Sequence, residues 1–213
     1  MITAASNSRI KRLVQLNQKS KLRRTEDVFL AEGVKMFLEA PREQLQEVYV
    51  SESFLEKCSC REHLEEVGYE VVSDSVFSKI SDTCTPQGVL CVLKQFHYNI
   101  EEMLRDKAPL FLLLENIQDP GNLGTMLRTG EGAGVSGIIM SRGTVDLYNP
   151  KVIRSTMGSI YRVPFYYADD FAAAVHQVQQ AGVSVYAAHL RGKNSYACQD
   201  YTKGTAFLIG NEG

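Results

Sequence analysis

Short apolar runs with little alternation constrain the fold of this chain more than any other feature. They stand at 110–114 (LFLLL), 137–140 (GIIM) and 183–188 (VSVYAA). A strand with one face in solvent alternates apolar and polar residues, whereas a strand covered on both faces does not. Segments of helical character separate these runs, so the second half is predicted to form a parallel α/β sheet.

Alternating strands and helices are predicted over the whole chain. In the second half we expect strands at 110–115, 137–141, 163–167, 183–188 and 206–209, with helices at 121–132, 149–157 and 169–180. In the first half we expect helices at 8–18, 34–40, 54–67 and 75–80, with strands at 28–31, 48–50, 69–72 and 89–93. A charged segment without a clear pattern lies between the halves. This predicts a small domain at 1–97, a linker at 98–108 and a second domain at 109–213.

Composition excludes several classes of protein. No apolar run approaches the roughly 20 residues that span a bilayer, and the N-terminus lacks the apolar stretch of a secretory signal. The five cysteines show no C-x-x-C spacing and the four histidines no metal spacing. We therefore expect a cytoplasmic protein with no membrane partner and no metal.

The charge is distributed unevenly along the chain. Residues 1–25 contain seven basic residues and no acid, although the net charge of the 213 residues is −2. A basic arm on an otherwise acidic protein suggests a polyanionic partner. A solvated helix face explains the same pattern equally well.

The segment Leu112–Val135 is predicted to be a buried strand, an irregular loop and a helix with one cation, Arg128. Ligands of open α/β sheets bind at such loops, beyond the carboxyl ends of the strands. Asn122 lies near the start of this helix, and a cation there suits a phosphate or a developing oxyanion. The alternative is that Arg128 forms a salt bridge with Glu131 at i+3.

Two further patterns in the sequence each allow two interpretations. Residues 132–137 fit G-x-G-x-x-G, but they close a helix and precede a strand, so a tight turn is predicted instead of a dinucleotide site. A second polar cluster follows another predicted strand and loop: Lys151, Arg154, Ser155 and Thr156. It either lines the same edge of the sheet or simply ends a helix.

Three segments together resemble the SpoU (TrmH-type) class of the SPOUT methyltransferases. ENIQDPGNLGTMLRTGEGAGV at 115–135 is similar to the first motif of that family, and NPKVIRSTMGSIYRVPF at 149–165 to the second, with Thr156 in place of the usual serine. FLIGNEG at 207–213 is similar to the start of the third motif. VFLAEGVKMFLEA at 28–40 resembles the family's substrate-binding domain, which is folded like ribosomal protein L30e.

This resemblance implies an α/β fold with an L30e-like N-terminal domain and a parallel-sheet SPOUT domain whose C-terminus forms a trefoil knot. It also implies a homodimer that methylates a ribose 2′-hydroxyl of RNA with S-adenosylmethionine, on ribosomal RNA in preference to transfer RNA. The catalytic residues implied are Arg128, Asn122 and Glu212. The cofactor residues implied are Ala188, His189, Gly210 and Gly213. With the basic arm, the RNA-binding residues are expected to be Arg9, Lys11, Arg12, Lys21, Arg23, Arg24, Lys151, Arg154 and Thr156.

The end of the sequence carries its own expectation. A strand followed by G-N-E-G is a place where a parallel α/β fold forms a ligand loop, and a helix is expected next. The family's third motif continues into further cofactor-binding residues that do not follow here. We therefore expect the natural chain to be longer and the knot to be incomplete in this one. The alternatives to an enzyme of this class are a non-catalytic RNA-binding protein and a small-molecule enzyme that uses a nucleotide.

Overall fold

The computed structural model describes residues 1–210, and this part of the chain divides into two compact units. The first unit comprises Met1–Phe96 together with Asp146–Tyr161. The second comprises His97–Val145 and the chain from Arg162 onward. The segment Asp146–Tyr161 therefore packs with the N-terminal residues, although it lies far from them in sequence.

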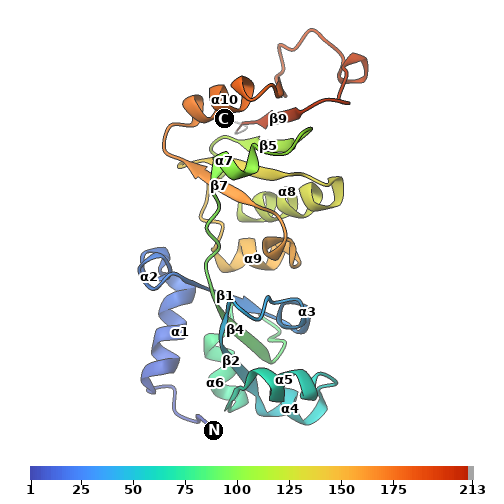
Figure 1. Ribbon diagram of the computed structural model, residues 1–213. Coiled ribbons are helices and arrows are strands. Elements are labelled where there is room, and N and C mark those ends of the chain that lie inside the picture. Colours follow the sequence, from blue (N-terminus) through green and yellow to red (C-terminus); the bar gives the residue numbers. More distant parts are fainter. Residues whose placement is uncertain (211–213) are drawn as a thin grey trace. The chain divides into compact units, whose positions relative to one another are not determined.

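The first unit is built on a four-stranded sheet in the order β1-β4-β2-β3 (Figure 1). β2 and β3 are parallel, whereas β4 is antiparallel to both of its neighbours. The strands are β1 (Val28–Glu32), β2 (Leu45–Ser51), β3 (Glu70–Val72) and β4 (Val89–Lys94). The helices are α1 (Ser8–Gln18), α2 (Ser20–Glu26), α3 (Val34–Leu38), α4 (Glu52–Lys57), α5 (Arg61–Val67), α6 (Asp74–Ile80) and α9 (Pro150–Thr156), and a 3-10 turn follows at Ser159–Tyr161.

Helix α1 forms where its cap and its apolar spacing predict it. The Asn7 side chain accepts a hydrogen bond from the Arg9 amide and thereby satisfies one of the free donors at the helix start. Ile10, Leu13 and Leu16 recur at helical spacing and are buried in one core with residues of the sheet. The prediction of this helix is confirmed at both ends.

The predicted single helix at 54–67 is wrong in one respect. The structure contains two helices there, α4 and α5, because Cys58 adopts an extended backbone conformation (φ −71°, ψ 137°). Cysteine and serine are weak helix formers, so the C-S-C sequence at 58–60 breaks the helix without a glycine or proline.

The second unit contains a five-stranded, wholly parallel sheet in the order β7-β6-β5-β9-β8 (Figure 1). Its strands are β5 (Leu110–Leu114), β6 (Gly137–Ser141), β7 (Phe165–Ala168), β8 (Ser184–Ala187) and β9 (Thr205–Ile209). Its helices are α7 (Ile100–Met103), α8 (Pro120–Ala133) and α10 (Phe171–Gln180), with a 3-10 turn at Tyr196–Cys198. The parallel α/β sheet predicted from the bare apolar runs is confirmed.

Burial explains those runs. All five residues of β6 are buried, and β5 buries Phe111, Leu113 and Leu114. The edge strand β8 has no fully buried residue. The glycine-rich turn after α8 is confirmed as a helix end, because Gly134 is left-handed (φ 74°) and its amide bonds back to the carbonyl of Glu131. No helix in residues 1–210 is long and apolar enough to cross a membrane.

Candidate functional site

The carboxyl ends of the five parallel strands define the candidate site in the second unit. Parallel strands end at the same edge of a sheet, so the loops after β5, β6, β8 and β9 lie along one edge. The loop after β5 leads into α8, and the loops after β8 and β9 begin at neighbouring strands. The sequence-predicted residues of the second unit follow these strands.

The loop after β5 is held by side chains that the sequence analysis did not single out. The Ser141 hydroxyl, at the end of β6, accepts a hydrogen bond from the Asn116 amide (2.9 Å). The Gln118 side chain donates to the carbonyls of Asn116 (3.2 Å) and Gly143 (2.5 Å). Asn116 has a left-handed backbone (φ 55°), a conformation that asparagine tolerates better than most residues. The sequence signal for this network was a polar residue at or after the end of two neighbouring strands, namely Asn116 after β5 and Ser141 at the end of β6.

Helix α8 begins at this loop with a well-defined cap. The Asp119 carboxylate accepts a hydrogen bond from the Asn122 amide (2.7 Å), and Pro120 occupies the first turn. Along the helix, Leu123, Gly124, Leu127 and Gly130 are buried. The cap therefore fixes the start of α8 at the carboxyl end of β5, and the burial of one face fixes its rotation.

Arg128 is exposed on α8 and makes no hydrogen bond or ion pair with any residue that the structure describes. The alternative salt bridge to Glu131 is not formed, because Glu131 pairs with Arg162 instead. Helical side chains lean toward the N-terminus, so Arg128 is expected to extend over the residues one turn earlier, Gly124 and Thr125. Of these two residues, Thr125 is exposed and Gly124 is buried.

Asn122 and Arg128 lie on the same helix, and no hydrogen bond joins their side chains. Six residues of α-helix separate two side chains by about 9 Å along the axis and by about 120° around it. Asn122 is exposed near the helix start, and its backbone amide bonds to Asp119. The two side chains can therefore meet one ligand from different sides, but neither orients the other in this structure.

The residues expected to hold a cofactor follow β8 and β9. Ala188 and His189 come after β8, and Gly210 comes after β9; all three are exposed. The Ala188 amide bonds to the Leu208 carbonyl (3.0 Å), which keeps the two strand ends together. Apart from its chain neighbours, no described residue has an atom within 4 Å of a Cβ added at Gly210. Glu212 and Gly213, the other two residues predicted here, lie outside the described residues.

In the first unit, the basic arm separates into paired and unpaired cations. Arg9 pairs with Glu70 (3.0 Å), and Arg12 pairs with both Glu26 and Glu47 (2.7 Å each). Burial opposes the charged form of Arg12, but the two carboxylates outweigh burial and raise the pKa of its guanidinium. By contrast, Lys11, Lys21 and Arg24 are exposed, with no ion pair to any residue within 1–210.

Arg23 differs from the rest of the arm because it is buried, with 3% of its surface exposed. Its guanidinium donates to the carbonyls of Leu16 (2.6 Å) and Asn17 (3.1 Å) and to the carboxylate of Asp146 (2.6 Å). A side chain enclosed in this way does not present its charge to a phosphate. The structure therefore gives no support to direct RNA contact by Arg23.

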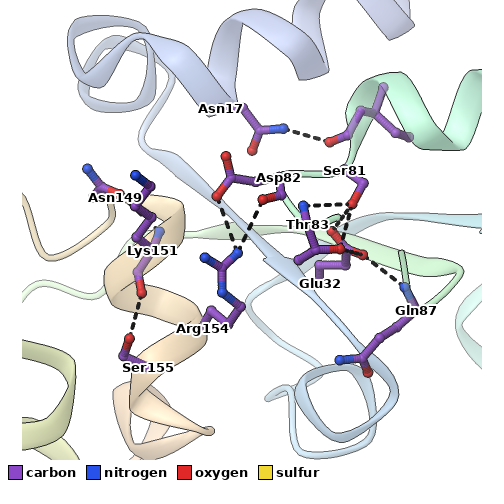
Figure 2. A network of polar contacts seen from close by, with 11 residues as sticks. Asn17, Glu32, Ser81, Asp82, Thr83, Gln87, Asn149, Lys151, Arg154 and Ser155 are labelled. Carbon is purple, nitrogen blue, oxygen red and sulfur yellow. Dashed lines mark hydrogen bonds and ion pairs between the residues drawn. The ribbon is translucent and has the colours of Figure 1, made fainter. Parts of the chain in front are cut away.

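The second predicted cluster lies on α9. The Asn149 side chain caps this helix by accepting from the Lys151 amide (2.9 Å), and the Lys151 side chain is exposed. Arg154 pairs with Asp82 (3.3 Å; Figure 2). Thr156 is completely buried, and its hydroxyl donates to the Ile153 carbonyl (2.7 Å). Lys151 is the member of this cluster whose charge is unpaired among the described residues.

Glu32 organises the loop that faces α9, and the sequence analysis missed it. Its carboxylate accepts hydrogen bonds from the hydroxyls of Ser81 (2.7 Å) and Thr83 (3.2 Å) and from the Gln87 amide (3.0 Å; Figure 2). The loop 81–87 therefore has a fixed course on the side where Asp82 meets Arg154. Within residues 1–210, no group of three or more His, Cys, Asp or Glu side chains is arranged so that it could hold a metal ion.

Two protein-family models match the chain. The SpoU rRNA Methylase family matches residues 109–213. The MRM3-like substrate binding domain matches residues 7–91. The two matches therefore fall on consecutive parts of the sequence.

Individual relatives agree with these matches. A 23S rRNA guanosine 2′-O-methyltransferase of Bacillus subtilis, RlmP, is 32% identical over 100% of this chain and 82% of its own length. The human mitochondrial rRNA methyltransferase 3 is 42% identical over 88 residues, which are 39% of this chain and 21% of that protein. The crystal structure of an rRNA methyltransferase from Sinorhizobium meliloti is 28% identical, with a TM-score of 0.85 over 99% of this chain and 81% of that one. A second structure of an rRNA methyltransferase from this organism, with AdoMet bound, gives a TM-score of 0.82 over 99% of this chain and 80% of that one, also at 28% identity.

Proposed function

Because the chain belongs to the SpoU rRNA methylase family, we propose that it transfers a methyl group from S-adenosylmethionine to a ribose 2′-hydroxyl of ribosomal RNA. The observation that carries the proposal is the similarity over the whole chain to a ribosomal RNA 2′-O-methyltransferase. This similarity favours an enzyme over the alternative of a non-catalytic RNA-binding protein.

Arg128 is the residue to which we assign the central catalytic role. A ribose hydroxyl is a weak nucleophile, and negative charge grows on its oxygen as the methyl group is transferred. A guanidinium stays protonated in proteins, so Arg128 acts by electrostatic stabilisation and by holding the neighbouring phosphate, and not as a general base. Its exposure and its lack of a partner within residues 1–210 leave the charge available for this task.

Two further residues complete the proposed catalytic set. Asn122, at the start of the same helix, orients the substrate from the other side of the axis. Glu212 is assigned to bind a substrate or arginine group by its match to the family's acidic residue, and it lies outside the described residues.

The proposed cofactor residues are Ala188, His189, Gly210 and Gly213. Ala188, His189 and Gly210 support this assignment, because they are exposed at adjacent strand ends, where ligands of parallel sheets bind, and no described residue other than its chain neighbours lies within 4 Å of a Cβ added at Gly210. S-adenosylmethionine, when bound, supplies a methyl group on a sulfonium. The protein would hold the cofactor through backbone groups at the edge of the sheet.

For RNA, we propose contact by the exposed cations Lys11, Lys21, Arg24 and Lys151, which are free to meet phosphates. Arg9, Arg12 and Arg154 are weaker candidates for RNA contact, because each already pairs with a carboxylate. Thr156 and Arg23 are buried, so we assign them to holding the surface in shape.

Further proposals concern the whole molecule. We propose a homodimer that works in the cytoplasm, sequence domains at 1–97 and 109–213 with a linker between them, and a C-terminal trefoil knot. Within the second of these sequence domains, Asp146–Tyr161 packs with the first unit of the structure. Sedimentation of the purified protein checks the dimer, and a mass equal to one chain contradicts it.

The decisive experiment combines cofactor binding with methyl transfer. Calorimetric titration of S-adenosylmethionine into the protein should give saturable binding. Incubation with ribosomal RNA and methyl-labelled cofactor should leave label at a 2′-O position. Binding of RNA without binding of cofactor would instead establish the non-catalytic alternative. An RNA complex that weakens steeply with salt would count against a small-molecule enzyme.

A further inference from the structure

The course of the segment Asp146–Tyr161 depends on a buried arginine from the other end of the sequence. Arg23 lies in α2, and it is the one residue of that helix classed as buried. One guanidinium nitrogen donates to the carbonyls of Leu16 and Asn17 at the end of α1, and the other donates to Asp146. Arg23 therefore ties the end of α1 to the first residue of this segment.

From Asp146 the contacts continue into α9. The second carboxylate oxygen of Asp146 accepts from the Tyr148 amide (3.1 Å), and the Asp146 carbonyl accepts from the Asn149 amide (2.9 Å). Asn149 in turn caps α9 through the Lys151 amide. An unbroken series of hydrogen bonds thus runs from the Arg23 guanidinium to the first turn of α9.

The other attachments of this segment are of a different kind. The Tyr148 hydroxyl meets the backbone of Phe96, and its ring packs against Phe29 with centroids 4.8 Å apart. The Tyr161 hydroxyl donates to the Met36 carbonyl (3.0 Å). The ion pair between Arg154 and Asp82 (Figure 2) is nearly half exposed at the arginine, whereas Arg23 is enclosed. Removing one partner of a charge pair with a buried member is strongly destabilising, whereas an exposed pair contributes little to stability.

We infer that Arg23 is a positioning residue, which fixes the turn at 146–149 and thereby the first turn of α9. The sequence pattern grouped Arg23 with the phosphate-binding cations of the basic arm. Its burial and its three partners assign it instead to the segment that matches the second motif of the family. The consequence for methyl transfer rests on the proposed function; the consequence for the order of α9 does not.

The test compares four single variants of the full chain: Arg23→Lys, Asp146→Asn, Asp146→Glu and, as matched control, Arg24→Met. A lysine keeps the charge but cannot reach both carbonyls and the carboxylate at once, because its donors share one nitrogen. Amide hydrogen exchange over 147–157 should become about tenfold faster in Arg23→Lys and Asp146→Asn, while exchange in β5 stays unchanged. Asp146→Glu keeps the carboxylate, so its exchange over 147–157 should be slower than in Asp146→Asn.

Kinetics separate positioning from RNA contact. In Arg23→Lys, kcat for methyl transfer should fall about tenfold, with little change in the KM for RNA or in its salt dependence. Arg24→Met should show the reverse, a weaker affinity for RNA with normal exchange in α9. Unchanged exchange over 147–157 in Asp146→Asn would overturn the inference, and so would an Arg23→Lys variant that behaves like Arg24→Met. If the unaltered protein transfers no methyl group, the proposed function fails, and the exchange comparison still decides the role of Arg23.

Discussion

Two helices each carry an arginine that the sequence marked as functional, and the structure treats them in opposite ways. Arg128 on α8 is exposed and has no partner among the described residues, whereas Arg23 on α2 is enclosed by two carbonyls and a carboxylate. A cation that a protein leaves unpaired at a ligand edge is available for a substrate. A cation that the protein surrounds with its own acceptors is part of the fold.

The same contrast divides the whole basic arm. Residues 1–25 contain seven basic residues, and six of them were expected to contact phosphates: Arg9, Lys11, Arg12, Lys21, Arg23 and Arg24. Partners reduce this number, because Arg9, Arg12 and Arg23 already meet carboxylates. Fewer cations of the arm are therefore available for the proposed RNA contact than the composition suggests, and those without a carboxylate partner among residues 1–210 are lysines and Arg24.

The largest effect is expected at Arg128. Arg128→Ala should lower the rate of methyl transfer about 100- to 1,000-fold, because the role proposed for Arg128 is to supply a preorganised positive charge where the oxyanion develops. The binding of S-adenosylmethionine and the unfolding curve should stay unchanged, since Arg128 has no partner within residues 1–210. Single-turnover kinetics with labelled cofactor measures the change, and Arg128→Lys is the control for charge without the planar group. An active alanine variant would remove Arg128 from the catalytic set.

The free energy of unfolding should fall when Arg23 is replaced and should hardly change when Arg24 is replaced. Arg23→Met leaves Asp146 and two carbonyls without their donor, and it should lower the free energy of unfolding of the first unit by about 3 kcal/mol. Arg24→Met, on the exposed side of the same helix, should change it by less than about 0.5 kcal/mol. Urea denaturation of both variants measures the difference. Equal free energies of unfolding in Arg23→Met and Arg24→Met would show that Arg23 is no more important for the fold than Arg24.

A smaller effect is expected at the start of α8. Asp119→Ala removes the side chain that accepts from the Asn122 amide, and loss of such a cap costs about 1 kcal/mol. Asp119→Asn should preserve most of the stability, because an amide oxygen caps nearly as well. Thermal unfolding measures both. If Asp119→Ala lowers activity as strongly as Arg128→Ala without loss of stability, then Asp119 has a role in the reaction beyond capping.

The smallest effect is expected for the exposed cations of the arm. The double variant Lys21→Gln, Arg24→Gln should leave stability unchanged and reduce the salt slope of RNA affinity by about 1 to 2. Filter binding at several salt concentrations measures the slope. An unchanged slope would mean that these side chains form only a solvated helix face.

Local patterns predicted the elements whose signals are complete within a few residues. α1 begins and ends where the cap and the apolar spacing place it, and β6 has the predicted limits because its run is buried throughout. α2 was not predicted, because its one residue classed as buried is an arginine and the apolar pattern of a helix is therefore missing. α7 is a helix of only four residues and gives no pattern to detect.

In the candidate site too, features set by adjacent residues could be predicted, whereas features that depend on residues far away in the sequence could not. The place of Arg128 on a capped helix after a buried strand follows from adjacent residues. The burial of Arg23 depends on Asp146, 123 residues away in the sequence. The network of Glu32 likewise joins a strand to a loop about 50 residues later. No window of sequence contains both members of such a pair, so only the folded chain reveals them.

The membership of Asp146–Tyr161 in the first unit has a consequence for synthesis on the ribosome. The N-terminal residues emerge first, but the unit they belong to is complete only when Tyr161 has left the exit tunnel. At roughly 5 to 20 residues per second, translation of the 65 residues between Phe96 and Tyr161 adds about 3 to 13 seconds of waiting. During that interval Phe29 lacks the ring of Tyr148, and Arg23 lacks the carboxylate of Asp146. Until Asp146 and Tyr148 are available, the core of the first unit is therefore incomplete, although β5 and β6, two of the five strands of the next sheet, have already been made.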